Sequence, residues 1–265
     1  MSLFRSGDAQ LLYEVAGNGP DVVLLHPFPL NRHFWDPVTP QLSTRYRLII
    51  PDLRGHGDSE LGEGPATMQK LADDLSRLCR EESISKAFFV GMSIGGYLLF
   101  EFWRRYREQV AALVLANTRP GAETPEGKAS RLQLADRVLR EGPAGFLGEM
   151  LSKLLSQATR TNRPDIVDAA RKMMQSMSAE DIAGVQRGMA ERPDSVATLA
   201  TINVPTLLIA GGDDSIPLSE FELMRQQISG SRLQVISQAG HYAALEKPAE
   251  FGGLLRKLFD ELPQR

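Results

Sequence analysis

The chain has 265 residues, of which 42% are apolar and 24% are charged, and its formal net charge is −3 at pH 7. This length allows one large α/β domain with an insertion and a substantial core. The scattered arginines form no basic patch, so nucleic acid is not expected as a partner. The N-terminal stretch, Met1 to Asp8, is polar and lacks the apolar core of a signal peptide, and no apolar run is long enough to span a bilayer. We therefore expect a cytoplasmic protein without a membrane partner, and homo-oligomerisation stays open.

Cys79 is the single cysteine. An intrachain disulfide and a cysteine-based metal site are therefore excluded. Cys79 follows Leu71, Leu75 and Leu78 at helical spacing, which favours a buried structural thiol over a nucleophile.

Short apolar runs alternate with amphipathic helical patterns through most of the chain. The first two runs are separated by a Gly-Asn-Gly-Pro turn, which predicts a hairpin-like opening. The alternation itself is typical of an α/β fold with a mainly parallel, twisted sheet and helices on both faces, whose ligands bind at the carboxyl ends of the strands. The expected strands are Gln10–Ala16, Asp21–Leu25, Leu48–Ile50, Ala87–Val90, Ala111–Asn117, Val204–Ala210 and Leu233–Ile236.

A proline-rich loop, His-Pro-Phe-Pro at positions 26–29, follows the second expected strand. Pro27 and Pro29 have no N–H, so only Phe28 could donate a backbone hydrogen bond from the centre of this loop to a substrate. The alternative is a stiff connection whose aromatic side chain packs into the core.

A glycine-flanked serine follows the expected strand Ala87–Val90 in the pattern G-x-S-x-G, with Ser93 at its centre and Gly91 and Gly95 on either side. A tight strand-to-helix turn of this kind exposes the serine hydroxyl. The helix that starts there favours negative charge, and the Ile94 N–H is well placed to meet an oxyanion. This arrangement suits acyl transfer, although a glycine-rich helix start with a solvent-facing serine would give the same pattern.

One long segment, residues 119–194, breaks the alternation and contains several helical patterns interrupted at Gly-Pro, Arg-Pro and similar pairs. We interpret it as an inserted helical cap, with residues 1–118 and 195–265 forming the core domain. Each cap helix has one apolar face at three-and-four spacing, which either packs as core or partly roofs a pocket.

A nucleophilic serine needs a base, and the base needs an orienting carboxylate, because a neutral serine is a poor nucleophile at pH 7. His241 follows the last expected strand and a glycine, which frees its loop to aim the ring. The other histidines are interpreted as structural or helix-start residues, namely His26, His33 and His56.

Taken together, these motifs resemble the α/β-hydrolase superfamily over nearly the whole chain, in the family's order of nucleophile, acid and histidine. The similarity is greatest to small carboxylesterases, 3-oxoadipate enol-lactonases and cofactor-free perhydrolases. Pro27 departs from the commoner glycine of the oxyanion loop. The matching segments are His26–Pro29, Asp52–Ser59, Gly91–Gly95, Gly211–Asp214 and the loop around His241 and Glu246.

This resemblance implies a serine hydrolase that cleaves a small-molecule ester or lactone through an acyl-enzyme, with Ser93 as nucleophile and His241 as base. It also implies that the Phe28 and Ile94 N–H groups form the oxyanion hole and that Phe28 and Met92 contact the substrate. No metal or organic cofactor is expected. Two alternatives stay open: a ligand receptor or signalling protein with slow or no turnover, and a C–C hydrolase or perhydrolase that uses the same residues.

The acid of the triad is either Asp213 or Asp214, since adjacent residues in extended chain face opposite ways. Counting forward from Gly211 by the family's spacing favours Asp214, whereas counting back from Pro217 favours Asp213. We prefer Asp214, because a deletion in the following loop costs less than a register shift in a buried strand.

Overall fold

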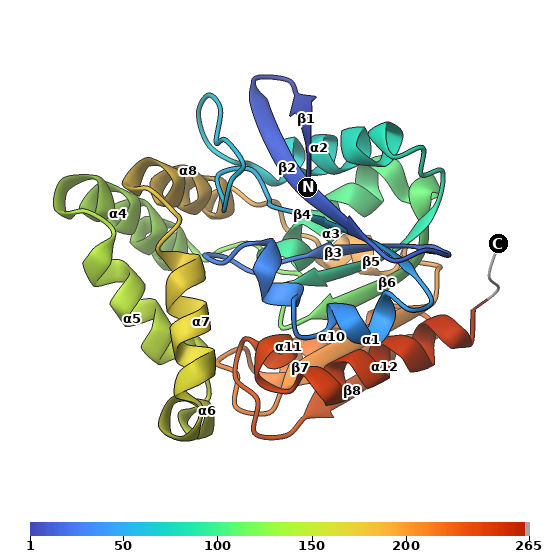
Figure 1. Ribbon diagram of the computed structural model, residues 1–265. Helices are drawn as coiled ribbons and strands as arrows, with labels where there is room; N and C mark the ends of the chain where they lie inside the picture. Colours follow the sequence, from blue (N-terminus) through green and yellow to red (C-terminus); the bar gives the residue numbers. More distant parts are fainter. Residues whose placement is uncertain (263–265) are drawn as a thin grey trace.

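The computed structural model describes residues 1–262 and contains a twisted sheet of eight strands in the order β1-β2-β4-β3-β5-β6-β7-β8 (Figure 1). Strand β2 is antiparallel to both β1 and β4, and the remaining neighbours are parallel. The strands are β1 Ser2–Ser6, β2 Ala9–Ala16, β3 Asp21–Leu25, β4 Arg47–Pro51, β5 Ala87–Met92, β6 Val110–Ala116, β7 Thr206–Gly211 and β8 Arg232–Ile236.

Two adjacent phenylalanines of β5 show that helices cover both faces of the sheet. Phe88 stacks on Phe259 of α12 (Pro248–Asp260), whereas Phe89 packs on Phe102 of α3 (Ile94–Tyr106), each with ring centroids 4.9 Å apart. Neighbouring side chains of a strand point to opposite faces, so α12 and α3 lie on opposite sides. The predicted α/β architecture is therefore confirmed.

Other helices extend these two layers. Helix α1 packs beside α12, and α2 packs beside α3 (Figure 1). Cys79 is a fully buried free thiol in α2, and burial raises its pKa to about 12. The bounds are η1 Arg32–Trp35, α1 Thr39–Leu42, α2 Met68–Glu81, η2 Arg107–Gln109, α9 Val196–Leu199, α10 Leu218–Gln227 and α11 Ala243–Glu246.

Six helices stand between β6 and β7 in the chain, and the first five of them form a group beside the sheet, drawn from green to yellow-brown in Figure 1. Helices α4 and α8 pack against each other, and α5 packs against α7. No helix among residues 1–262 is long and apolar enough to cross a membrane. The five helices are α4 Pro125–Glu141, α5 Ala144–Leu154, α6 Gln157–Asn162, α7 Pro164–Met174 and α8 Ala179–Ala190.

The expected hairpin between the first two apolar runs is wrong. Strand β2 pairs with β1 and β4, while β3 lies between β4 and β5. The burial patterns give the reason: β2 alternates between buried and more exposed residues, as suits a strand toward the edge, whereas β3 is buried from Val22 to Leu25. A strand buried on both faces belongs in the parallel centre of the sheet.

Candidate active site

Ser93 occupies a sharp turn between β5 and α3. Its backbone has φ 55° and ψ −113°, a conformation that non-glycine residues rarely adopt. The Ser93 N–H donates to the Ala116 carbonyl at 3.0 Å, and the Thr118 hydroxyl donates to the Ser93 carbonyl at 2.9 Å. Residues at the end of β6 therefore hold the strained turn in place. Such strain persists only where the surroundings enforce it, and it is concentrated at functional sites.

The glycines beside Ser93 allow backbones to approach closely. A Cβ atom at Gly91 would lie 2.5 Å from the Gly95 carbonyl oxygen, and one at Gly95 would lie 2.7 Å from the Leu25 carbonyl oxygen. Either contact is shorter than real Cβ atoms tolerate, so a side chain at either position would displace the turn.

His241 and Asp214 lie in contact at the carboxyl ends of the strands. Nδ1 of His241 lies 3.0 and 2.9 Å from the two Asp214 carboxylate oxygens. The Asp214 side chain is fully buried, and Asn117 Nδ2 also donates to it, at 2.7 Å. Burial alone would raise the pKa of Asp214, but His241 and the hydrogen bonds outweigh burial and lower it. The carboxylate is thus kept ionised beside the imidazole.

Asp213 lies elsewhere in the same turn. Its side chain is exposed, and its backbone N–H donates to the Ala239 carbonyl at 2.8 Å. The structure therefore brings Asp214, and not Asp213, to the imidazole of His241.

The loop that carries His241 is tied to the helices between β6 and β7. The His241 N–H donates to the Leu154 carbonyl at 2.9 Å. Glu246, which is buried, accepts from the Gly240 N–H at 2.9 Å, from the Ser156 N–H at 3.0 Å and from the Thr159 hydroxyl at 2.6 Å. These contacts fix the position of the histidine loop relative to α5 and α6.

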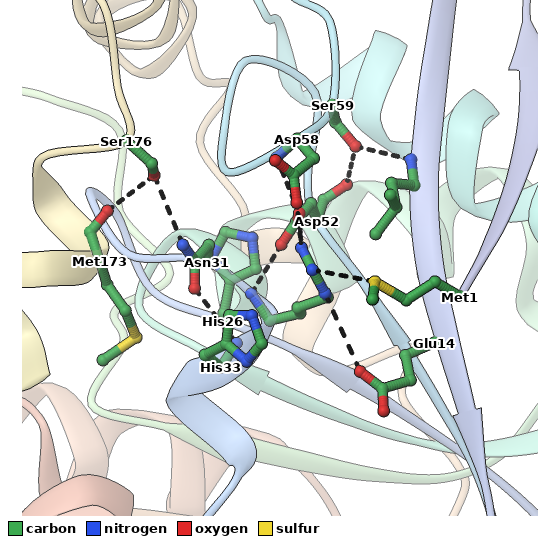
Figure 2. A network of polar contacts seen from close by, with 12 residues as sticks. Met1, Glu14, His26, Asn31, His33, Asp52, Asp58, Ser59, Met173 and Ser176 are labelled. Atoms are coloured by element: carbon green, nitrogen blue, oxygen red, sulfur yellow. Dashed lines mark hydrogen bonds and ion pairs between the residues drawn. The ribbon is translucent and has the colours of Figure 1, made fainter.

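A polar network around Asp52 holds the loop that follows β3 (Figure 2). Its carboxylate accepts from the Arg32 backbone N–H at 2.7 Å, from Arg32 Nη1 at 2.5 Å and from the Asp58 N–H at 2.9 Å. Asn31 in the same loop donates to the Ser176 hydroxyl at 3.4 Å, which links the loop to the segment after α7 (Figure 2). The network rigidifies the loop on the side that follows Phe28.

Phe28 itself is held from several sides. Its carbonyl accepts from the Tyr242 hydroxyl at 3.2 Å, and its ring contacts those of His56 and Phe146. Within residues 1–262, neither the Phe28 N–H nor the Ile94 N–H donates to a protein acceptor. Ile94 is the first residue of α3, where an N–H has no partner within the helix. Both donors are available to a ligand.

Three of the four histidines are occupied elsewhere. His26 Nε2 accepts from the Leu53 N–H at 2.9 Å, and burial lowers the pKa of His26 to about 4. His56 is also buried; burial first, then the neighbouring His26, lower its pKa to about 3. His33 is exposed and contacts Asp36 at 3.0 Å. Both buried rings are therefore neutral at pH 7.

A cavity of about 410 Å³ brings Ser93, His241 and Phe28 together. Among the described residues no hydrogen bond joins the Ser93 hydroxyl to the His241 ring. The remaining lining residues are Tyr97, Arg119, Ser130, Arg131, Leu134, Met150, Leu154, Gln186, Met189, Ser215, Ile216 and Pro217.

Met92 requires a correction. It was expected in the substrate pocket, but its side chain is fully buried at the end of β5, where it pairs with Ala116 of β6, and it is not among the lining residues. The alternation of the strand accounts for this, because side chains at adjacent positions cannot both face the cavity. Sequence reasoning also missed Arg119 and Arg131, which line the cavity from the loop after β6 and from α4.

Comparison with known proteins identifies the family of this fold. Residues 20–248 match the family model described as the alpha/beta hydrolase fold. The chain is similar to a thermophilic esterase from Thermogutta terrifontis in a malate-bound structure, with 39% identity, coverage of 96% of this chain and 94% of that one, and a TM-score of 0.93. It is 27% identical to 3-oxoadipate enol-lactonase 1 of Acinetobacter baylyi over 88% of this chain and 86% of the relative. It is 29% identical to the pimeloyl-[acyl-carrier protein] methyl ester esterase of Nitrosomonas europaea over 92% and 97% of the two chains. The chain belongs to the alpha/beta hydrolase fold family.

Proposed function

We propose that the protein hydrolyses carboxylic esters or lactones, with Ser93 as nucleophile, His241 as base and Asp214 as the carboxylate that orients His241. The observation that carries this proposal is the buried Asp214–His241 contact, because the ring lines the same cavity as a serine on a strained turn. The names of the relatives support the same class, since they include an esterase, an enol-lactonase and a methyl ester esterase.

The mechanism starts with attack of the Ser93 hydroxyl on the carbonyl carbon. Nε2 of His241 accepts the proton, and Asp214 stabilises the imidazolium through Nδ1–H. The C–O bond to the leaving alcohol then breaks, His241 returns the proton to that alcohol, and the acyl group stays on Ser93. Water repeats the sequence and releases the acid. The hydrogen bond between Ser93 and His241 would form on substrate binding, since such contacts commonly tighten only in the complex.

The negative charge that develops on the carbonyl oxygen needs preorganised donors. In this proposal the Phe28 and Ile94 N–H groups supply them, because neither is used by a protein acceptor within the described residues. The Asp52 network holds one donor and α3 holds the other, so neither has to be ordered during the reaction. Loss of one such donor typically costs 10²–10³-fold in turnover in other hydrolases.

The helices of residues 119–194 act in this proposal as a cap that shapes the substrate pocket. Seven of the cavity-lining residues come from α4, α5 and α8, namely Ser130, Arg131, Leu134, Met150, Leu154, Gln186 and Met189. Flexible methionines suit a pocket that accepts acyl or alcohol groups of different shape.

Steady-state hydrolysis of a panel of p-nitrophenyl esters tests the proposal. Wild-type protein should turn over many equivalents of the acetate or butyrate ester, and Ser93→Ala should reduce the rate to background while circular dichroism stays unchanged. A single burst equivalent to the enzyme concentration would instead support a receptor with slow turnover. Wild-type turnover by Ser93→Ala would refute the proposal.

A further inference from the structure

Two guanidinium groups face the candidate reaction cavity. They belong to Arg119 and Arg131. In the part of the chain that the structure describes, no other lysine, arginine, aspartate or glutamate lines this cavity. Their side chains are 34% and 23% exposed, so they are neither fully solvated nor sealed in the core. A positive charge placed in a mostly apolar cavity calls for an explanation, because an uncompensated buried charge is costly.

Glu123 provides the nearest compensation. One of its oxygens accepts from Arg119 Nη2 at 2.9 Å, and the other accepts from Arg131 Nε at 2.7 Å and also pairs with Arg192. The Glu123 side chain is only 6% exposed. One carboxylate therefore serves three guanidinium groups, which leaves two positive charges without a matching negative charge.

Arg192 does not face the cavity. It is buried, it donates to the Gly121 carbonyl at 3.1 and 2.9 Å, and its guanidinium lies 4.3 Å from the centre of the Tyr97 ring. These contacts are those of a structural residue. The excess positive charge of the cluster is therefore presented to the cavity by Arg119 and Arg131.

Other carboxylates near the cavity do not remove this excess. Asp214 is buried against His241. Glu220 influences Arg119 electrostatically, but the only carboxylate within ion-pair distance of Arg119 in residues 1–262 is Glu123. Arg131 uses Nε for Glu123 and Nη1 for Gln186 at 2.8 Å, and its Nη2 has no acceptor among the described residues. Arg119 also interacts with the side chain of Tyr97, which lines the same cavity. Arg131 thus retains a free donor for a ligand, and Arg119 adds its positive charge beside it.

We propose that Arg119 and Arg131 form a carboxylate-binding subsite, so that the preferred substrates are esters or lactones carrying a free carboxylate away from the scissile carbonyl. This inference rests on the proposed ester or lactone hydrolysis at Ser93. Guanidinium groups suit the role because their planar donors match the two oxygens of a carboxylate. The subsite would add affinity and fix the direction in which the substrate lies.

The carboxylate could belong to the acyl group or to the alcohol, and two substrate pairs distinguish these cases. Monomethyl glutarate against dimethyl glutarate tests the acyl side. 4-Acetoxybutanoate against butyl acetate tests the alcohol side. Release of methanol or acetate, followed by proton NMR, gives kcat/KM for the charged and the neutral member of each pair.

The wild-type protein should prefer the charged ester of at least one pair by roughly tenfold or more in kcat/KM, the range expected for hydrogen bonds to a charged group. Arg119→Gln and Arg131→Gln should each lower the charged-to-neutral ratio by about tenfold, mainly through KM. Arg137→Gln is the matched control: Arg137 also lies on α4, pairs with Glu149 and does not line the cavity. It should keep the wild-type ratio.

The inference is overturned if the wild-type ratio is one or less in both pairs, or if both arginine variants keep it within twofold. In either case ester hydrolysis itself would still stand. If no ester of either pair is hydrolysed and the p-nitrophenyl esters are not turned over either, the proposed function fails instead. Calorimetric binding of monomethyl glutarate to the Ser93→Ala protein, with and without Arg131→Gln, then tests the subsite alone: it stands if the affinity falls in the double variant and is rejected if the affinity is unchanged or no binding occurs.

Discussion

Asp214 faces Nδ1 of His241 with both of its carboxylate oxygens, at 3.0 and 2.9 Å. The neighbouring Asp213 is exposed and contributes only its backbone N–H to the turn. One residue of register therefore separates a buried carboxylate that can fix the tautomer of the imidazole from a carboxylate that meets water. This difference makes the two aspartates a matched pair for mutagenesis.

Asp214→Asn should reduce ester turnover by up to roughly 10⁴-fold, because an amide in place of the carboxylate favours the wrong tautomer of His241. Asp213→Asn should change turnover by less than about threefold. Both variants would be assayed on one ester, with circular dichroism to check folding. If Asp213→Asn loses turnover and Asp214→Asn keeps it, Asp213 and not Asp214 is the carboxylate that orients His241.

Glu123 should make stability depend on pH in the acid range. Burial would raise its pKa, but Arg131 and Arg192 outweigh burial and lower it from 4.5 to about 2. Its contribution is therefore fully present above pH 4.5 and is lost as the pH falls towards 2.

The measurement is urea unfolding of the wild-type protein and Glu123→Gln between pH 7 and pH 2. The variant should be less stable at pH 7, and the two curves should converge as the pH approaches 2. Asp8, whose pKa is also lowered to about 2, is present in both proteins and cancels in the difference. A difference that stays constant over this range contradicts the assignment of the pH dependence to Glu123.

Gly91→Ala should both destabilise the protein and impair catalysis. The new Cβ would lie 2.5 Å from the Gly95 carbonyl, so the turn has to shift, at a cost of about 1–3 kcal/mol. A shift of the nucleophile by about 1 Å can cost 10²-fold in rate. Gly253→Ala is the control, because nothing lies within 4 Å of its Cβ position in α12. It should be neutral or stabilise by up to about 1 kcal/mol. Equal effects of the two variants on turnover would argue against a tightly packed serine turn.

Ser93→Ala and His241→Ala should act as a unit. Each should abolish turnover, and the double variant should be scarcely worse than either single variant, because the base has no role without the nucleophile. Rates measured on the same ester under the same conditions would show this non-additivity. Multiplicative losses would indicate that the two residues act in separate steps.

Much of this fold could be predicted from the sequence, because its signals are local. The apolar run before Gly91 predicts a strand, the glycines around Ser93 predict a tight turn, and the other apolar runs predict further strands, each from neighbouring residues alone. Pairing between strands is not local, and this is why the expected hairpin was wrong: the Gly17–Pro20 turn fits a hairpin, but the partners of β2 and β3 depend on burial on both faces. Strand β1 was missed because only two of its five residues are buried.

Some residues of the candidate site could also be proposed from local signals in the sequence. Phe28 could be singled out because its proline neighbours have no N–H, and Asp214 because the length of a buried strand constrains its register. The prediction that Met92 contacts the substrate was wrong because every residue of β5 is buried, so no alternation in the sequence marks the side that faces the cavity. The arginine pair was missed, since Arg119 lies in the loop after β6 and Arg131 lies on α4, and their shared contact with Glu123 depends on how that loop packs against the helix.

The central claim is that Ser93 is the nucleophile, and covalent labelling tests it most directly. Native protein would be treated with a fluorophosphonate, digested, and analysed by mass spectrometry to find the modified residue. The account predicts one stoichiometric adduct on the peptide that contains Ser93, and loss of labelling in both Ser93→Ala and His241→Ala. An adduct on another residue, or unchanged labelling of the Ser93→Ala protein, would contradict it.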